Sequence, residues 1–436
     1  MAGICGVASK KGDCSNDLFW ETFYLQHRAQ DYCGLALSNK GRLYPSTHKG
    51  LIRPEFPKER LKTMEGEHGI GVVASDRQPV SELGKNGLIL GFDGNITNNE
   101  KLKNRLIKKG FTFSGYHNPE EVSDSVLVSK IIAREPDFVS GVESLVELME
   151  GDFSIVALTK DGIYAARGWG RKPLILGQKD EGYAVSSESN SFVNTGFKIV
   201  RDVTPGEIVL MNKDGVESVK TLDLSPIKFG TFEWIYTAYP ASVIDGMPVS
   251  EVRKKMVSLL MKRYPVEADV VSPVPNSGRW HAIGTQYAKG FNLPYEEVFV
   301  RYDYSDRSYT QEEQEDRDQE GSIKLIPVES SIRGKKIIIV DDSIVRGTQT
   351  LNQVDRLKNE FGAEEVHARI ACPPLMHACS YGKTTKEDKD CIARRMSIED
   401  IQKKLLLNSL GYATVDDLEK AIGMPRSKLC LECWAD

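Results

Sequence analysis

The chain has 436 residues, well above the size of one ordinary hydrophobic core, so two domains are expected. Its 57 basic and 62 acidic residues give a net charge of −5, which argues against a nucleic-acid-binding protein. With 40% hydrophobic and 27% charged residues, the composition is typical of globular proteins and excludes a disordered chain. No apolar run approaches the ~20 residues that span a bilayer, and the first residues do not resemble a secretion signal. The sequence predicts a soluble, cytoplasmic protein without a membrane partner.

The sequence pattern of the first half predicts short strands with helices between them. The predicted strands are apolar, β-rich segments closed by Gly, Asp or Ser. They lie at 69–74, 88–92, 153–158 and 182–186, and helical patterns cover 98–109 and 125–134. Clustered strands with intervening helices predict a layered α+β or αββα domain that closes near residues 205–210, with a linker at about 223–228.

The second half alternates strands and helices. Strands are predicted at 268–274, 296–300 and 336–340, and helices at 249–263 and 349–361. The continuous apolar run at 337–340 is typical of a parallel strand that is buried on both faces. We therefore expect an α/β domain with a parallel sheet at 226–436. An acidic run at 311–320 is predicted to form a loop.

The most specific motif spans residues 337–350. A buried strand ends in Asp341 and Asp342, and a loop rich in Ser, Gly and Thr then opens a helix. Successive loop N–H groups and a helix N-terminus form a cradle for a phosphate, and the acidic pair can accept hydrogen bonds from two ribose hydroxyls, directly or through a metal ion. A capped strand-to-helix turn would explain only one Asp and one Ser or Thr. The predicted phosphoribosyl-binding residues are Asp341, Asp342, Ser343, Arg346, Gly347, Thr348 and Thr350.

This motif closely resembles the phosphoribosyl pyrophosphate (PRPP) motif of the type I phosphoribosyltransferases. The segment 273–278, with Ser277 and Gly278, is similar to their pyrophosphate-binding loop. Segments 25–28, 93–95, 123–125, 187–189 and 202–207 follow the order of the glutamine PRPP amidotransferase family, and the resemblance covers almost the whole chain. It implies an N-terminal-nucleophile (Ntn) glutaminase-like αββα domain at 1–225. A type I phosphoribosyltransferase domain with a cysteine-containing tail would follow at 226–436.

The resemblance implies two coupled reactions. The first domain would hydrolyse glutamine, and the second would add ammonia to PRPP, giving 5-phosphoribosylamine and pyrophosphate in the first step of purine nucleotide synthesis. PRPP and glutamine or ammonia are then the expected ligands. Asp341 and Asp342 would hold Mg²⁺, nucleotides would act as effectors, and the chain would form a homo-oligomer.

The resemblance also assigns residues in the first domain. Cys5 matches the nucleophile, and because its own α-amine would serve as base, residues 1–4 would have to be removed. The alternative is that Cys5 is a buried structural cysteine. Asp93 and Gly94 match the position of the oxyanion hole, Asp124 would hold the substrate amine, and Arg28 lies in the substrate-binding motif.

Three departures from the family lie at positions that would bind substrate or stabilise the oxyanion. Ala74 stands where the family has an Arg that clamps the glutamine carboxylate, and Asp93 replaces an Asn that serves the oxyanion hole. Loss of such a donor costs about 10²–10³ in rate. In the transferase half an acidic run replaces a basic loop, and Arg317 and Lys324 remain as pyrophosphate partners. The alternative is a paralogue with an inactive glutaminase half, either ammonia-dependent or a non-catalytic protein that binds PRPP or nucleotides.

The last cysteines form a candidate metal site. Cys379, Cys430 and Cys433 resemble three of the four ligands of a [4Fe–4S] cluster that some family members hold. The fourth family position is Gly230 here, and Cys391 would complete a four-thiolate set for a cluster or for zinc. Equally open is that the tail binds no metal.

Overall fold

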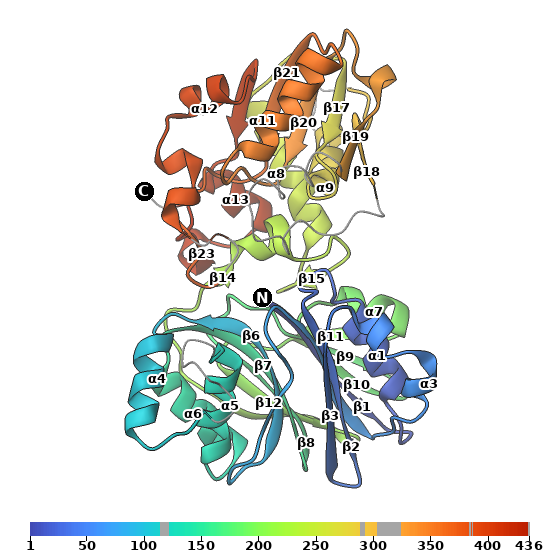
Figure 1. Cartoon of the computed structure of the whole chain (residues 1–436), viewed down its shortest axis with the longest axis vertical. Helices are drawn as coiled ribbons and strands as arrows, with labels where there is room; N and C mark the ends of the chain where they lie inside the picture. Colours follow the sequence, from blue (N-terminus) through green and yellow to red (C-terminus); the bar gives the residue numbers. More distant parts are fainter. Residues whose placement is uncertain (114–121, 288–292, 303–323, 383–384, 386, 435–436) are drawn as a thin grey trace. The chain divides into compact units, whose positions relative to one another are not determined.

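A computed structural model describes residues 1–113, 122–287, 293–302, 324–382, 385 and 387–434 (Figure 1). The chain forms two compact units. The first unit comprises Met1–Gly230, Ala241–Gly246 and Ser380–Lys383; the second comprises Thr231–Pro240, Met247–Cys379 and Thr384–Asp436. Two short segments from the second half of the chain thus belong to the first unit. No single boundary in the sequence therefore separates the two units.

The first unit has four layers, with two stacked antiparallel sheets between two layers of helices (Figure 1). One sheet has the order β11-β9-β10-β1-β4-β2-β3, and the other has the order β13-β12-β8-β7-β6-β5. The strands of the first sheet are β1 (Ala2–Ser9), β2 (Tyr32–Asn39), β3 (Arg42–Lys49), β4 (His68–Ala74), β9 (Ile175–Lys179), β10 (Gly182–Ser186) and β11 (Lys198–Asp202). Those of the second are β5 (Val80–Glu82), β6 (Leu88–Ile96), β7 (Gly151–Thr159), β8 (Gly162–Arg167), β12 (Glu207–Asn212) and β13 (Gly215–Thr221). The predicted αββα architecture is confirmed.

The helices cover the outer faces of the two sheets. α4 (Asn99–Lys108), α5 (Asp124–Arg134) and α6 (Phe138–Leu148) pack on the second sheet, while α1 (Ser15–Phe23) packs on β1 and β4 of the first. The shorter helices are α2 (Ile52–Glu55), α3 (Lys58–Leu61) and α7 (Asn190–Thr195).

Alternate side chains of strand β1 pack in two different hydrophobic cores. Side chains at successive positions point to opposite faces of a sheet. Ala2, Ile4 and Ala8 therefore pack in the core between the two sheets, whereas Cys5 and Val7 pack on the opposite face against α1.

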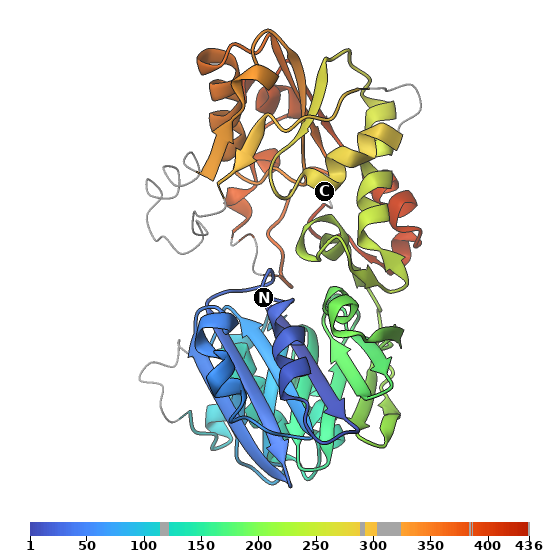
Figure 2. The ribbon, with the colours of Figure 1, turned by 90° about the vertical axis from the view of Figure 1, so that its right-hand side faces the viewer.

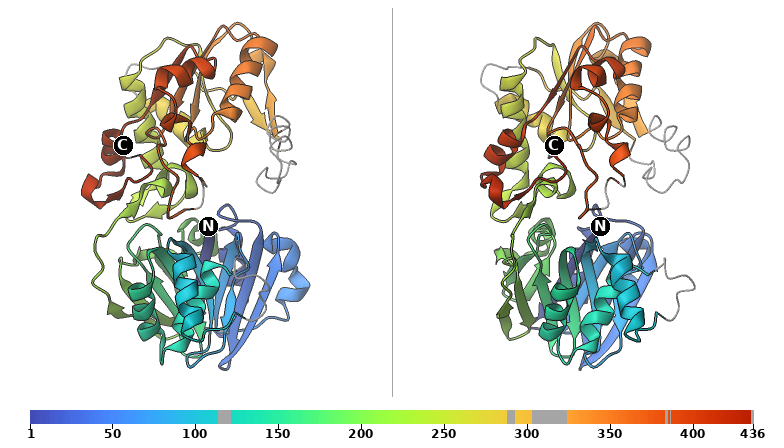
Figure 3. Two further views of the ribbon diagram at one scale, coloured as in Figure 1. Left: turned by 60° about the vertical axis from the view of Figure 1, so that its left-hand side comes forward. Right: turned by 90° about the vertical axis from the view of Figure 1, so that its left-hand side faces the viewer.

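The second unit contains a four-stranded parallel sheet in the order β17-β20-β21-β22, with helices on both sides (Figures 2 and 3). Its strands are β17 (Val270–Pro273), β20 (Lys336–Asp341), β21 (Glu365–Ile370) and β22 (Ser409–Tyr412). The helices are α8 (Val249–Arg263), α9 (Arg279–Ile283), α11 (Thr348–Asp355), α12 (Ile398–Lys404) and α13 (Val415–Ile422). Two-residue strands lie at Phe229–Gly230 (β14) and Val243–Ile244 (β15) in the first unit, and at Met247–Pro248 (β16) and Leu429–Cys430 (β23) in the second. The parallel sheet predicted for this half is confirmed.

Two details of the second half differ from the prediction. The strand expected at 296–300 is β18 (Phe299–Arg301), which pairs antiparallel with β19 (Leu325–Pro327) outside the parallel sheet. The helix expected at 349–361 is α11 followed by a π-helical turn at Arg356–Glu360. The acidic run at 311–320 lies outside the described residues.

Within the described part of the chain, no helix combines the length and the apolar character needed to cross a bilayer.

Candidate functional site

The carboxyl end of β20 carries the acidic pair. Residues 337–340 of this strand are at most 2% exposed because the strand is central in the sheet, between β17 and β21, and helices cover both faces of the sheet. The strand ends at Asp341, and Asp342 follows with 4% exposure. In open α/β sheets ligands bind beyond the carboxyl ends of the strands, so the fold places both carboxylates where a ligand is expected.

The loop after β17 reaches the same strand end. The Val274 N–H donates to the carbonyl of Val340 at 2.9 Å, and Ser277 Oγ donates to Asp341 Oδ1 at 2.8 Å. A Cβ on Gly278 would lie 2.1 Å from the Val340 carbonyl oxygen, so only glycine permits this approach. The structure therefore brings Ser277 and Gly278 together with the acidic pair, as the sequence predicts.

A tight turn connects the acidic pair to α11. Gly347 has a φ of +82°, a left-handed conformation that favours glycine, and it immediately precedes the first helical residue, Thr348. Ser343 Oγ donates to Asp342 Oδ2 at 2.7 Å, and Thr350 is 8% exposed in the first turn of the helix. The N–H groups at the start of α11 have no partner within the helix, which suits an anion.

The acidic pair has the character of a divalent-cation site. Desolvation raises the pKa of Asp341 well above its ordinary value, and the negative charge of Asp342 raises it further, while the hydrogen bond from Ser277 opposes both. Two adjacent carboxylates in such surroundings are stabilised by a cation. Mg²⁺ typically uses one or two protein carboxylates and takes its other ligands from water and substrate phosphates. Asp341 and Asp342 fit that pattern.

Two predicted anion partners have other contacts. The Arg346 side chain is 44% exposed, and its Nε donates to Asp390 Oδ1 at 3.1 Å. Lys324 immediately precedes β19, and its carbonyl accepts a hydrogen bond from the Tyr302 N–H at 2.8 Å. The structure thus places Arg346 on an acidic neighbour and Lys324 at the hairpin.

The cysteine-rich tail does not assemble the expected four-thiolate set. Cys379 and Cys433 share a hydrogen bond, which together with burial raises the pKa of Cys433, and Cys430 adds to the effect. Cys391 is fully buried instead next to Ile392, whose N–H donates to Val345. Within the residues that the structure describes, no three His, Cys, Asp or Glu side chains are arranged to hold a metal. The cluster or zinc site predicted on Cys379, Cys391, Cys430 and Cys433 is therefore unsupported among the described residues.

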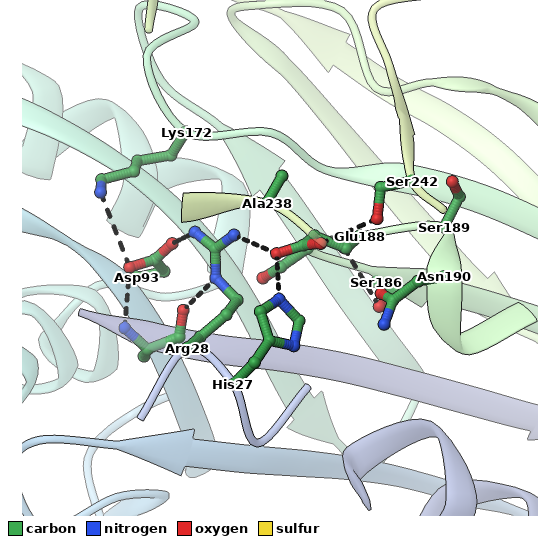
Figure 4. A network of polar contacts seen from close by, with 12 residues as sticks. His27, Arg28, Asp93, Lys172, Ser186, Glu188, Ser189, Asn190, Ala238 and Ser242 are labelled. Atoms are coloured by element: carbon green, nitrogen blue, oxygen red, sulfur yellow. Dashed lines mark hydrogen bonds and ion pairs between the residues drawn. The ribbon is translucent and has the colours of Figure 1, made fainter. Parts of the chain in front are cut away.

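In the first unit, buried charges converge on the first residue of β1 (Figure 4). Arg28 Nη2 contacts Asp93 Oδ2 at 3.0 Å, and Arg28 Nη1 contacts Glu188 Oε1 at 2.6 Å. The same guanidinium donates through Nε to the Ala2 carbonyl at 2.8 Å, and the Ala2 N–H donates to Asp93 Oδ1 at 2.9 Å. All three charged side chains are fully buried. We call Arg28, Asp93, Glu188 and Lys172 the charged cluster.

The remaining contacts of the cluster balance its charge. Lys172 Nζ lies 3.9 Å from Asp93 Oδ1, and Glu188 also accepts from Ser242 Oγ and contacts His27, each at 2.8 Å. Burial by itself would raise the pKa of Asp93, but the positive charges of Lys172 and Arg28 outweigh it and hold the pKa below its usual range. Asp93 is therefore an ionised carboxylate.

Three further predicted residues lie at defined places in this unit. The Cys5 side chain is fully buried on the α1 face of β1, with its Sγ 3.3 Å from Thr22 Oγ1, and burial raises its thiol pKa well above the ordinary value. Asp124 accepts a hydrogen bond from the Ile96 N–H at 3.1 Å and contacts the Asn99 side chain. Gly94 lies in β6 opposite Phe153. The structure does not bring Cys5 to the charged cluster.

Sequence reasoning missed three members of this site. Ala2, Lys172 and the carboxylate of Glu188 received no role. The even spacing of Ala2, Ile4 and Ala8 could have predicted that residue 2 lies on the face of β1 that packs between the two sheets. Nothing in the sequence pattern placed Lys172 near Asp93, because the two are far apart along the chain.

Comparisons with known proteins agree with both halves of the fold. Residues 66–194 match the model of a glutamine amidotransferase domain, and residues 248–405 match that of a phosphoribosyl transferase domain. The amidophosphoribosyltransferase of Methanothermobacter thermautotrophicus is 32% identical, with 99% of this chain and 93% of that protein aligned. That of Archaeoglobus fulgidus is 33% identical over 99% and 96% of the two chains.

A solved structure matches the whole chain as well. The glutamine PRPP amidotransferase of B. subtilis, complexed with ADP and GMP, superposes with a TM-score of 0.90 at 30% identity, covering 99% of this chain and 96% of that one. Full-length similarity at this level joins two units that each match their own domain model. The chain belongs to the amidophosphoribosyltransferase family.

Proposed function

We propose that the chain transfers an amine nitrogen to PRPP and releases pyrophosphate, giving 5-phosphoribosylamine for purine nucleotide synthesis. The observation that carries this proposal is the acidic pair at the end of β20, with Ser277 hydrogen-bonded to Asp341 and the Gly347 turn leading into α11. Carboxylates, loop N–H groups and a helix start gathered at one strand end match the diol and the phosphates of a phosphoribosyl group. The named relatives support the same activity.

Each part of the second-unit site has a task in this reaction. Asp341 and Asp342 accept hydrogen bonds from the ribose hydroxyls, and the turn at Ser343–Gly347 with Thr348 and Thr350 holds the 5′-phosphate. Ser277 and Gly278 lie at the pyrophosphate, where Lys324 contributes charge. Asp341 and Asp342 would hold Mg²⁺, which would supply positive charge at the leaving pyrophosphate. The nitrogen lone pair forms a bond to C1, the bond from C1 to the pyrophosphate oxygen breaks with its electron pair, and one proton leaves the nitrogen.

Purine nucleoside monophosphates are proposed as effectors of this site. A nucleoside 5′-monophosphate carries the same ribose diol and 5′-phosphate as PRPP, so the groups at the end of β20 would accept either ligand. The relative from B. subtilis was solved with ADP and GMP bound. Inhibition by GMP that increasing PRPP relieves would support binding at this site.

The direct test is pyrophosphate release from PRPP with ammonium and Mg²⁺. We expect release by the wild-type chain and its loss in an Asp341→Asn/Asp342→Asn variant. Asp269→Asn is the matched control, because Asp269 is an exposed carboxylate that contacts the opposite, amino end of β20. PRPP binding without pyrophosphate release would instead identify a non-catalytic, regulatory protein.

A further inference from the structure

The first residue of β1 lies where the buried polar groups of the first unit converge. The backbone of Ala2 contacts both Arg28 and Asp93, and Ala2 pairs directly with Ala74 on β4. Covalent cleavage of an amide by a side chain needs a nucleophile such as a thiol or a hydroxyl. At this position the chain presents a methyl group, and the residue opposite also presents a methyl group.

Cys5 cannot serve in place of residue 2. Positions 2 and 5 are an odd number of residues apart, so their side chains point to opposite faces of the strand. The Cys5 thiol accordingly contacts Thr22 and the Gly71 carbonyl in the layer under α1. Its burial favours the neutral thiol over the nucleophilic thiolate.

Exposing the α-amine of Cys5 would also dismantle the site. Removal of residues 1–4 would delete the pairs that Ala2, Gly3 and Ile4 form with β4. It would also remove the Ala2 N–H and the Ile4 N–H, which donate to Asp93 at 2.9 Å and to Ser187 Oγ at 3.0 Å. Asp93 is fully buried, so loss of a donor leaves part of its charge uncompensated.

The charged cluster also opposes amide hydrolysis. Asp93 is ionised and points its Oδ1 at the backbone of residue 2. A negative charge there repels the oxyanion that would form during attack on a carboxamide. Arg28 is engaged by both Asp93 and Glu188, and the cluster neutralises itself without a ligand.

We infer that the first unit does not hydrolyse glutamine and that the nitrogen donor of the proposed transfer is free ammonia. This inference rests on the proposed function of the second unit. Ammonia supplies both the lone pair that forms the bond to C1 and the proton that is lost, so the reaction balances without a glutaminase step. The first unit then acts as a scaffold.

The test measures two products separately in the full-length chain with PRPP and Mg²⁺. Glutamate released from glutamine reports on the first unit, and pyrophosphate released with ammonium reports on the second. We expect glutamate release at the background of a protein-free sample, alongside ammonium-dependent pyrophosphate release. Glutamate release above background overturns the inference, whichever side chain is responsible. Absence of pyrophosphate with ammonium overturns the proposed function, and the glutamate readout still decides the first unit.

Cysteine variants and a covalent probe locate any residual activity. Cys5→Ser and Cys14→Ser remove two buried thiols from the same layer under α1, so Cys14→Ser controls for the packing change. We expect both variants to retain the wild-type rate with ammonium. Intact-mass analysis after exposure to an electrophilic glutamine analogue is expected to show an unmodified chain. An adduct on Cys5, or a glutamine-dependent rate that only Cys5→Ser abolishes, overturns the inference.

Discussion

Asp341 and Asp342 act as a pair because adjacent carboxylates in one desolvated place favour a shared cation or shared donors over two separate charges. Replacing both with Asn removes the negative charges but keeps the side-chain volume. Each charge-assisted hydrogen bond is worth about 1.5–3 kcal/mol, so we expect PRPP affinity in Mg²⁺ to fall by roughly tenfold to a hundredfold per contact. Calorimetric titration measures this directly.

The matched control for that titration is Asp269→Asn, which should bind PRPP as the wild-type chain does. Wild-type affinity in the Asp341→Asn/Asp342→Asn variant would show that these carboxylates do not hold the ribose.

His281 gives the second unit a pH-dependent stability. Burial, reinforced by the positive charge of Arg253, lowers the pKa of His281 to about 3. Below about pH 6.5 the imidazole takes up a proton in the unfolded chain but stays neutral in the folded one. The free energy of unfolding should therefore fall as the pH drops from about 6.5 towards 3, by up to about 1.4 kcal/mol per pH unit from this residue.

Denaturant unfolding of the wild-type chain and of His281→Gln between pH 7 and pH 5 isolates that contribution. Gln can still donate to the Ile235 carbonyl, which His281 Nε2 contacts at 3.0 Å. As the pH falls, the free energy of unfolding of the wild-type chain should decrease more than that of His281→Gln. Parallel pH profiles would show that His281 is not buried in its neutral form.

At the scale of elements, the turn between β20 and α11 depends on glycine for two separable reasons. Gly347 has a positive φ, and a Cβ there would lie 3.1 Å from Leu405 Cδ2 and 3.2 Å from Ile392 Cδ1. Gly334 also has a positive φ, of +69°, but a Cβ there would meet no atom within 4 Å. Both Ala variants should lose about 1–2 kcal/mol of stability from the backbone conformation.

Gly347→Ala should lose more than Gly334→Ala because its neighbours must move, and only Gly347→Ala should weaken PRPP binding. Thermal unfolding with and without PRPP compares the two variants. Equal ligand-induced stabilisation in both would contradict a phosphate-binding role for this turn.

The elements that could be predicted are those specified by local patterns. The apolar run before Asp341 and the Ser, Gly and Thr residues after it lie in one short segment, so the strand, the turn and the helix start follow from the sequence. The helix at Val249–Arg263 and the strand at Gly182–Ser186 were likewise predictable from their periodicity. The hairpin of β18 and β19 was not, because its partner strands are separated by more than twenty residues.

At the scale of the whole molecule, the two-unit architecture and the family could be predicted, whereas the first-unit cluster could not. Arg28, Asp93 and Glu188 meet only because the turn after α1, strand β6 and the segment after β10 come together in the folded unit. The Cys5-Gly6-Val7 sequence resembled a nucleophile motif, but the register of β1 places residue 2, not residue 5, at the cluster. That register depends on pairing with distant strands.

Amination of PRPP by free ammonia predicts that pyrophosphate release depends on ammonium and not on glutamine. Pyrophosphate release by the wild-type chain is followed with PRPP and Mg²⁺, using ammonium or glutamine as the sole nitrogen source. With ammonium we expect pyrophosphate release. At a fixed total ammonium concentration and below the pKa of ammonium, the rate should rise about tenfold per pH unit, because the concentration of free ammonia rises by that factor. With glutamine we expect only background. Release with glutamine above background would contradict the use of free ammonia as the nitrogen donor, and no release with ammonium would contradict amination of PRPP by this chain.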